Sequence, residues 1–525
     1  MRAKSAVVMI GLDACDAGLA EGFATSGHLP NLGRLFTRGA RCRVRNPMGL
    51  FVGALWPTFS TGVRADRHGV HCWDEIDVAS YKRRTTTPHC DQQLLWERLS
   101  EEGRRVAVLD VPHMQGDKPV NGVQFAEWGC HDRHFGFKSW PLNLAGDIES
   151  AFGLHPIFGV DAYTAKSFAP DDYVLRSERL RNIDEDHALL DGLRRGIAQK
   201  GTIAKELLSQ GGWDLFLTVF GDSHAIGHQQ WHLHDPSHPR FDPDAVRALG
   251  GDPILQVYRD LDASLGELLS QVGEDATVLV LLSHGMGPHY DGTHLLDEIL
   301  HRIDEFDHGP LGLTTTMRRA TRSLAKHCAT AYAVPVMRWY ADLRKFKPCR
   351  EFVSAKQRAK QHFYVAPNNF CYGGVRFNVI GREPRGSVHP EDLDKICAQL
   401  TADLMALVNV ETGGPVITGV DKSSRWYRRS PEDTLPDLFL DWKRSGLIET
   451  VWSPKTGIVH APYVHWRSGD HRPEGLLLAY GSGIPSSTVL PSIEVEDLAP
   501  SIAGRLGVSF GETDGRTLAW LGTPV

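Results

Sequence analysis

Histidine and aspartate side chains in this sequence fall at spacings that suit a metal site. His224 and His228 are four residues apart, so on one helical turn or in a tight loop their imidazoles can meet a single ion. Adding His471 supplies three neutral nitrogen donors, which suit Zn²⁺ with one position open for water or substrate. Asp13 and His284 could hold a second ion about 4 Å away, the spacing that clamps both oxygens in a displacement at phosphorus. We therefore predict a divalent metal, Zn²⁺ by its ligands, with one ion at the three histidines and a second left open.

The elements that would position these residues are buried strands alternating with helices. The strands are expected where the sequence is continuously apolar, as strands covered on both faces must be, at 6–12, 105–109, 214–220, 276–282, 437–440 and 476–479. Amphipathic helical stretches such as 258–272 lie between them. This alternation predicts the α/β class, with a mostly parallel central sheet between layers of helices.

The chemically useful residues follow these strands directly. In open parallel sheets, ligands bind outside the carboxyl ends of the strands. The first strand ends at Asp13, the strand at 214–220 runs into 221–228, and the strand at 276–282 ends at Ser283 and His284. The segment 468–474 introduces the strand at 476–479, and if that strand is antiparallel its start lies on the same edge. Carboxylates and imidazoles remote in the chain should therefore collect at one edge of the sheet.

Composition excludes several classes of protein. The 525 residues include 57 Lys and Arg against 64 Asp and Glu, a formal charge of −7, which argues against a general nucleic-acid scaffold or a polybasic membrane binder. The apolar run 6–12 is too short to span a bilayer, and no longer run approaches that length. Nine scattered cysteines without a C-x-x-C pair indicate reduced thiols and a cytoplasmic location. The sequence leaves a homo-oligomer open.

The region 301–430 differs from the rest and is interpreted as an inserted cap between the core segments 1–300 and 431–525. Its basic helical part, 318–360, holds twelve Lys or Arg against two acids. This stretch is either a solvated helical surface or a positive face that attracts an anionic substrate or a membrane surface. A small α+β segment follows, in which 373–380 alternates like a strand with one solvated face.

Several short motifs occur in a fixed order along the chain. They are the opening strand to Asp13, Leu-Pro-Asn-Leu at 29–32, Trp-Pro-Thr-Phe-Ser-Thr-Gly at 56–62 with His-Gly at 68–69, Gly-His at 227–228, Ser-His-Gly-Met at 283–286, Asp-His-Arg-Pro-Glu at 470–474 and Val-Glu-Asp-Leu-Ala-Pro-Ser-Ile at 495–502. This ordered set resembles the alkaline phosphatase superfamily, in particular its type I phosphodiesterase/nucleotide pyrophosphatase branch. The resemblance covers roughly 1–300 and 430–525. It implies an α/β/α sandwich, two divalent ions and hydrolysis of phosphate esters, phosphodiesters or sulfate esters.

The resemblance also assigns roles to individual positions. It implies that Asp13 and His284 are ligands of one ion, and that His228 and His471 are ligands of the other. The sequence departs from the family pattern in three ways. In two of them a carboxylate is replaced, by the imidazole of His224 and by the hydroxyl of Ser283. The third is that no hydroxyl nucleophile occurs at the expected position near Val52. The second ion should therefore be weaker or absent, and the missing hydroxyl excludes the usual covalent phospho-enzyme step.

We predict a metal-dependent hydrolase of a phosphate-containing or other small anionic ester, with attack by metal-bound water and with His228, His284 and Asp13 as catalytic residues. The alternatives are a degenerate member that binds an anionic ligand without turnover, or a transferase or sulfatase-like enzyme of the same fold. Asp222 and Asp235 are candidates to orient the paired histidines. Candidate general acids or bases are His113, His131, His134, His289 and His294, and candidate oxyanion binders are Arg376, Arg382, Arg385 and Arg472.

Overall fold

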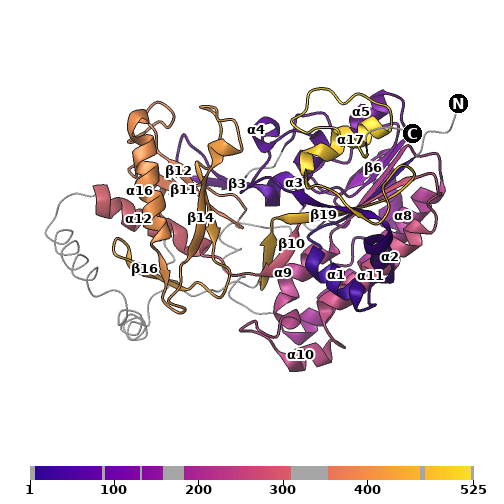
Figure 1. The fold of residues 1–525 in the computed structure, drawn as a ribbon, viewed down its shortest axis with the longest axis horizontal. Coiled ribbons are helices and arrows are strands. Elements are labelled where there is room, and N and C mark those ends of the chain that lie inside the picture. Colours follow the sequence, from indigo (N-terminus) through magenta and orange to yellow (C-terminus); the bar gives the residue numbers. More distant parts are fainter. Residues whose placement is uncertain are drawn as a thin grey trace. The chain divides into compact units, whose positions relative to one another are not determined.

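The structure, a computed structural model, describes residues 6–85, 89–130, 133–157, 182–308, 353–369, 371–461 and 467–521. The chain divides into two compact units (Figure 1). Unit 1 comprises Met1–Val70, Thr87–Pro288 and His465–Val525, and unit 2 comprises His71–Thr86 and His289–Val464. The predicted cap, 301–430, falls within unit 2, which extends past that range on both sides. Most of the basic stretch 318–360 lies outside the described residues.

Unit 1 is built on a ten-stranded sheet. Its strands are β1 (Val7–Leu12), β2 (Ala40–Arg45), β5 (Val106–Leu109), β6 (Gly122–Ala126), β7 (Lys138–Trp140), β8 (Leu215–Phe220), β9 (Thr277–Leu282), β19 (Glu474–Gly481), β20 (Thr488–Val489) and β21 (Ile493–Glu494). The order is β20-β2-β19-β9-β1-β8-β5-β6-β7, with β21 also paired to β2. Only β19 and β7 pair antiparallel with their neighbours. The predicted mostly parallel α/β sheet is confirmed, as is the antiparallel late strand.

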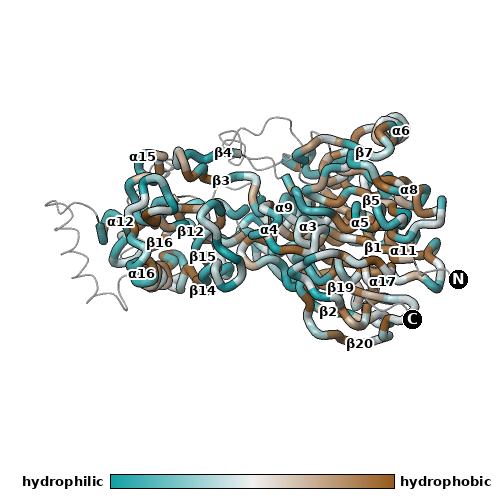
Figure 2. Tube along the Cα trace, turned by 90° about the horizontal axis from the view of Figure 1, so that it is seen from above, coloured by the Kyte–Doolittle hydropathy of each residue, from teal (hydrophilic) through white to brown (hydrophobic). Residues whose placement is uncertain are grey.

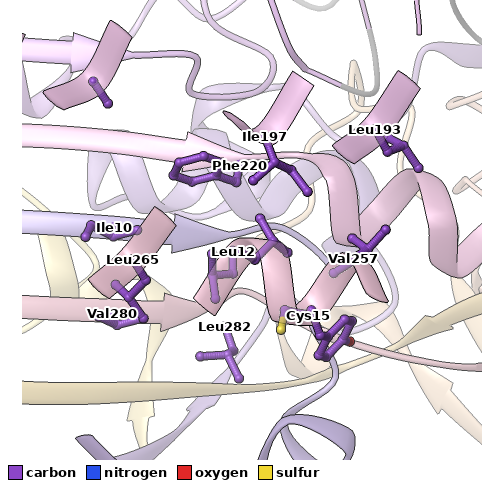
Figure 3. Close-up of a cluster of buried hydrophobic side chains, with 14 of the residues drawn as sticks. Ile10, Leu12, Cys15, Leu193, Ile197, Phe220, Val257, Leu265, Val280 and Leu282 are labelled. Atoms are coloured by element: carbon purple, nitrogen blue, oxygen red, sulfur yellow. The ribbon is translucent and has the colours of Figure 1, made fainter. Parts of the chain in front are cut away.

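Helices cover both faces of this sheet, because alternate residues of each strand point to opposite sides. Ile10 and Leu12 of β1 lie in one apolar cluster with side chains of α8 (Ile183–Ser209) and α11 (Pro253–Leu269), as Figure 3 shows. Val7 and Met9 lie in the opposite cluster with α3 (Phe51–Thr61), α5 (Leu95–Glu101) and α17 (Leu498–Arg505). A slip of one residue would exchange these faces, so burial on both sides fixes the register.

Apolar residues are concentrated on the central strands of unit 1, where β1 and β5 are coloured brown in Figure 2. All six residues of β1 and all four of β5 are buried. Helices α1 (Ala17–Thr25) and α2 (Pro30–Arg38) also pack on the face that carries α11. Among the described helices, none combines the length and the apolar character that crossing a membrane requires.

Unit 2 has an antiparallel sheet in the order β11-β12-β15-β14, formed by Phe363–Val365, Gly373–Phe377, Leu438–Trp442 and Ile417–Lys422. A second sheet joins β13 (Val408–Asn409), β16 (Thr450–Ser453) and β17 (Gly457–His460). Helices α12 (Thr293–His308) and α16 (Leu393–Met405) pack on them. The apolar run at 437–440 was expected in the parallel sheet and instead forms β15, because an apolar run predicts burial without specifying the sheet.

Strand β12 carries a buried arginine where a solvated face was predicted, since all five of its residues are buried. Nε of Arg376 lies 2.9 Å from a carboxylate oxygen of Glu383. Arg382 pairs in the same way with Asp437, at 2.7 Å. Arg429 pairs with Asp437 at 2.8 Å. These guanidinium groups are occupied by carboxylates of their own unit, so the prediction that Arg376 and Arg382 bind a substrate oxyanion is not supported.

Candidate metal centre

The carboxyl ends of β1, β8 and β9 lie side by side in unit 1. The strands are parallel, and Leu12 is in register with both Phe220 and Leu282. The residues that follow each strand therefore reach the same edge of the sheet. They are Asp13 after β1, the first turn of α9 (Asp222–His234) after β8, and Ser283 with His284 after β9. The predicted meeting of these segments is observed.

His471 comes to the same edge on a short strand, β18 (Gly469–Arg472), which pairs antiparallel with β10 (Gly285–Pro288). Strand β18 lies so close to α9 that a Cβ atom at Gly469 would be 2.1 Å from the carbonyl oxygen of Gly227. Only glycine permits this approach of two backbones. The approach brings the Gly469 carbonyl oxygen to 2.8 Å from Nδ1 of His228.

Three imidazole nitrogens converge at this point. Nε2 of His228 lies 3.0 Å from Nε2 of His224 and 3.1 Å from Nε2 of His471. One nitrogen from each of the three rings can be chosen so that all lie within 4.8 Å of one another. The three residues are 5 %, 0 % and 1 % exposed for His224, His228 and His471. The structure thus brings together the three histidines that the spacing suggested.

Hydrogen bonds determine where the protons of two of these rings lie. Nδ1 of His228 faces the Gly469 carbonyl oxygen, and Nδ1 of His224 lies 2.7 Å from a carboxylate oxygen of Asp13. A carbonyl or an ionised carboxylate can only accept, so both Nδ1 atoms carry the hydrogen. In a neutral imidazole the other nitrogen then holds a lone pair. The Nε2 atoms of His224 and His228 are therefore acceptors, the form in which histidine binds metal.

A chain of hydrogen bonds through Ser283 does the same for His471. Ser283 Oγ donates to Asp13 at 2.9 Å and accepts the backbone N–H of Ala14 at 3.0 Å. Its single hydrogen is used, so Nδ1 of His284, 2.9 Å away, must donate to it. Nε2 of His284 is then the acceptor for Nδ1–H of His471, at 2.8 Å. It follows that Nε2 of His471 also carries a lone pair, directed at the other two.

A divalent cation fits this arrangement. Three buried lone pairs that face one another repel unless a positive group lies among them, and three imidazoles suit Zn²⁺ or a similar borderline ion. One cationic group already contacts the cluster, since the guanidinium of Arg467 donates to Nε2 of His228. Arg467 is 5 % exposed and was not identified in the sequence, although it directly precedes the motif at 468–474.

Asp13 and His284 lie beside the three histidines, with 3.9 Å between His284 Nδ1 and Asp13 Oδ1. Oδ1 of Asp13 also accepts from Nε1 of Trp56 at 2.9 Å. Burial acts to raise the pKa of Asp13, but the charge that His224 can carry and the hydrogen bonds from His224 and Trp56 hold the pKa of this carboxyl well below its usual range. Asp13 is therefore a permanent anion next to the cluster.

Helix α3 begins beside these histidines with an aromatic residue. The ring centroid of Phe51 lies 5.5 Å from that of His284 and 6.2 Å from that of His471. The position near Val52, where the resemblance would place a nucleophile and the sequence has no hydroxyl, is thus in the first turn of α3. The hydroxyl of Thr58, farther along the helix, lies 2.9 Å from Nε2 of His68.

The remaining candidates have other partners. Asp235 accepts from Ser237 in a turn, so Gly469 and not Asp235 orients His228. A carboxylate oxygen of Asp222 lies 3.7 Å from Nε2 of His155, and burial raises the pKa of Asp222 to about 7. The ring of His113 stacks on that of His134, and Arg472 donates to backbone carbonyls. His289 and His294 belong to unit 2, and His131 lies outside the described residues.

Comparison with known proteins is consistent with this geometry. The sequence model described as type I phosphodiesterase/nucleotide pyrophosphatase matches residues 7–454. A phosphonoacetate hydrolase from Sinorhizobium meliloti 1021 superposes with a TM-score of 0.50 at 12% identity over 96% of both chains. Murine ectonucleotide pyrophosphatase/phosphodiesterase 5 gives 0.50 at 11% identity over 97% of both chains. No curated protein gives a significant sequence match. At such identities the solved structures establish the fold alone.

Proposed function

We propose that this chain, which belongs to the type I phosphodiesterase/nucleotide pyrophosphatase family, is a metal-dependent hydrolase of a small phosphate ester or phosphodiester. The observation that carries the proposal is the convergence of three Nε2 lone pairs, from His224, His228 and His471, in a buried position. Every one of these lone pairs is oriented by a hydrogen bond on the opposite nitrogen of its ring. Such pre-orientation is typical of sites built to hold an ion.

In this proposal the three histidines hold one ion, while Asp13 and His284 orient them. Asp13 fixes His224 directly and fixes His471 through Ser283 and His284. The carboxylate that the resemblance would place on an ion thus controls two ligands through hydrogen bonds. A bound Zn²⁺-like ion would supply Lewis-acid chemistry, polarising a phosphoryl oxygen and lowering the pKa of water towards about 7.

Arg467 is the residue that we assign to the substrate anion. Its guanidinium contacts the same Nε2 of His228 that an ion would need, and one lone pair cannot serve both. The guanidinium lies beside the position that an ion would take, and its paired N–H groups match the geometry of phosphoryl oxygens. The site would then combine one ion with one fixed positive charge.

The first turn of α3 supports direct attack by water. Phe51 presents a ring to His284 and His471, and the neighbouring side chains Leu50, Val52 and Gly53 offer no hydroxyl. A covalent phosphoryl-enzyme would need such a group within reach of the substrate. A single displacement by water follows, and it inverts the configuration at phosphorus.

The test is turnover of bis(p-nitrophenyl) phosphate and p-nitrophenyl phosphate by the full chain loaded with Zn²⁺, Co²⁺ or Mn²⁺. We expect hydrolysis that needs a stoichiometric ion and that stops when a chelator removes it. Intact substrates in the presence of the bound ion would overturn the proposal and favour the alternative, a protein that binds an anionic ligand without turnover.

The displacement is tested separately with a chiral phosphorothioate diester hydrolysed in ¹⁸O-labelled water. Inversion at phosphorus is the expected result. Retention would show two displacements and hence a covalent intermediate on this chain. It would overturn the claim that the first turn of α3, which begins with Phe51, leaves water as the nucleophile, but it would not affect the proposal of metal-dependent hydrolysis.

A further inference from the structure

Unit 2 contains a second group of metal-ligating side chains, separate from the one described above. Asp304 and His308 lie on the last turns of α12, and His362 immediately precedes β11. One ligand atom from each of the three residues can be chosen so that all lie within 4.8 Å of one another. Asp304 and His308 are four residues apart, so they share one face of the helix.

The proton of His362 is fixed by Asp304. Nδ1 of His362 lies 3.0 Å from Oδ1 of Asp304, and the backbone N–H of His362 donates to the same oxygen at 3.1 Å. A carboxylate can only accept, so Nδ1 carries the hydrogen and Nε2 holds the lone pair. This pairing of a carboxylate with an imidazole is the arrangement that orients metal-bound histidines.

His308 lies directly against this ring. The centroids of His308 and His362 are 3.8 Å apart, and the rings are inclined by 27°. Two stacked imidazolium cations would repel at this distance, so the stack favours the neutral, metal-binding form. The pair also stands at the carboxyl-terminal end of a 16-residue helix, where the helix dipole attracts a cation.

The group is open to ions from solution. His308 is exposed, and it lines a cavity of about 560 Å³ together with Asp307, Asp392 and Asp403. Lys455 lies 2.6 Å from Asp403 and also pairs with Asp307, so these two carboxylates are already matched by a cation. Asp304, His308 and His362 lie at the same end of α12, and none of them forms an ion pair with Lys455 among the described contacts.

We propose that Asp304, His308 and His362 form a second divalent-metal site, one that takes a borderline ion such as Zn²⁺, Co²⁺, Ni²⁺ or Cu²⁺. Asp304 orients His362 and adds a negative charge beside the two imidazoles, and imidazoles are ligands that these ions prefer, whereas Ca²⁺ and Mg²⁺ prefer oxygen. Water completes the coordination. A shared ion would link the end of α12 to the start of β11. Because only the folded chain brings these ligands together, the bound ion would stabilise the folded state of unit 2.

The experiment measures bound Zn²⁺ and Co²⁺ per chain after dialysis, on the full-length protein and on single variants. His308→Ala and His362→Ala should each bind one ion fewer than the parent, and Asp304→Asn should bind that ion roughly 10–100-fold more weakly. His301→Ala is the matched control, because His301 lies on the same helix but contacts Gln361 at 3.3 Å. It should bind as many ions as the parent.

A second measurement isolates the site. The variant His471→Ala lacks a ligand of the centre in unit 1, so in the full chain carrying it the visible absorption of bound Co²⁺ should come from the site in unit 2. Adding His362→Ala should abolish this absorption. Unchanged ion content in both His308→Ala and His362→Ala would overturn the proposal, as would an equal loss in His301→Ala. Because these readouts are ion counts and spectra, they are independent of whether the centre in unit 1 catalyses hydrolysis.

Discussion

Each unit contains a buried polar network, and these two networks are arranged in opposite ways. In unit 2, the guanidinium groups of Arg376, Arg382 and Arg429 lie against the carboxylates of Glu383, Asp433 and Asp437, so charges are matched within the protein. In unit 1, the hydrogen bonds with Asp13, Ser283 and the Gly469 carbonyl leave three imidazole lone pairs directed at one another.

The difference separates a structural network from a binding site. A network whose donors and acceptors match needs nothing more, and its charged residues are unavailable to a ligand. A network that concentrates acceptors in one place favours a positive group beside them, and in unit 1 the guanidinium of Arg467 already contacts one of these acceptors. The unit 2 arginines that were expected to bind substrate are therefore engaged by carboxylates, whereas the histidines that were expected to bind metal present acceptors to one another.

The largest effect that would break this comparison is expected for His228→Ala. This change removes the central lone pair, so bound ion and hydrolytic activity should both be lost, the activity by about 10³-fold or more because the reaction loses its Lewis acid. Metal analysis and turnover of an aryl phosphodiester measure it. His234→Ala is the control, since His234 lies on the same helix and pairs with Asp252 at 2.7 Å. Unchanged metal content in His228→Ala would remove this residue from the site.

In unit 2 the corresponding change is Arg382→Ala, which leaves Asp437 and Glu383 buried with one cation fewer. We expect a loss of about 3 kcal/mol in the free energy of unfolding of unit 2 and no change in ions bound at the centre in unit 1. Denaturant titration and metal analysis test the two parts. Arg385→Ala, at an exposed position, should change the stability by less than about 0.5 kcal/mol. Equal stability of the two variants would contradict the matched-network interpretation.

A smaller effect is expected for Ser283→Ala, which breaks the hydrogen-bond chain from Asp13 to His471. His284 loses the acceptor that fixes its proton, so ion affinity should fall about tenfold while the ligands themselves remain. Competition with a chelator of known affinity measures this. Ser501→Ala is matched, because Ser501 is equally buried in unit 1 and its hydroxyl bonds only to backbone atoms of 497 and 518. A similar loss of affinity in Ser501→Ala would show that the effect is general destabilisation.

The smallest effect is a pH dependence in unit 2. Burial acts to raise the pKa of Asp437, but hydrogen bonding and charge from Arg382, with Arg429, lower it below the ordinary value. A carboxyl whose folded pKa is depressed binds more protons when unfolded. Its contribution to stability is therefore complete above about pH 4 and is lost as the pH falls through the folded pKa. The free-energy difference between the parent and Asp437→Asn should shrink below about pH 4, and a constant difference would contradict the assignment.

Much of unit 1 could be predicted from sequence because its strands are uninterrupted apolar runs. Burial on both faces requires such runs, and their carboxyl ends carry Asp13, His224 and His284, so the edge where the site lies follows from topology alone. The run at 437–440 shows the limit, since the same local pattern forms an antiparallel strand in unit 2. Which sheet a strand joins depends on contacts remote in the chain.

The histidines that form the candidate metal centre were recognisable by type and spacing, but their partners were not. Trp56, Phe51 and Arg467 are ordinary core-like or surface-like residues in the sequence, and they matter only because folding brings them to the histidines. The hydrogen-bonding role of Ser283 was hidden for the same reason, since a serine after a strand is a common turn residue. Arg376 was predicted to bind a substrate oxyanion because the sequence does not show that its guanidinium pairs with Glu383, a contact that forms only when β12 is folded.

The position of β18 has a consequence for the newly synthesised protein. His228 and His471 are 243 residues apart, and the larger segment of unit 2, His289–Val464, is made between them. At a synthesis rate of about 5–20 residues per second, a ribosome would need roughly 10–50 s to make that interval. During this time the emerging polypeptide has two donors on α9 and lacks the third. Ion capture would then be among the last events of maturation, so a prematurely terminated product would be distinguishable by its failure to retain the metal.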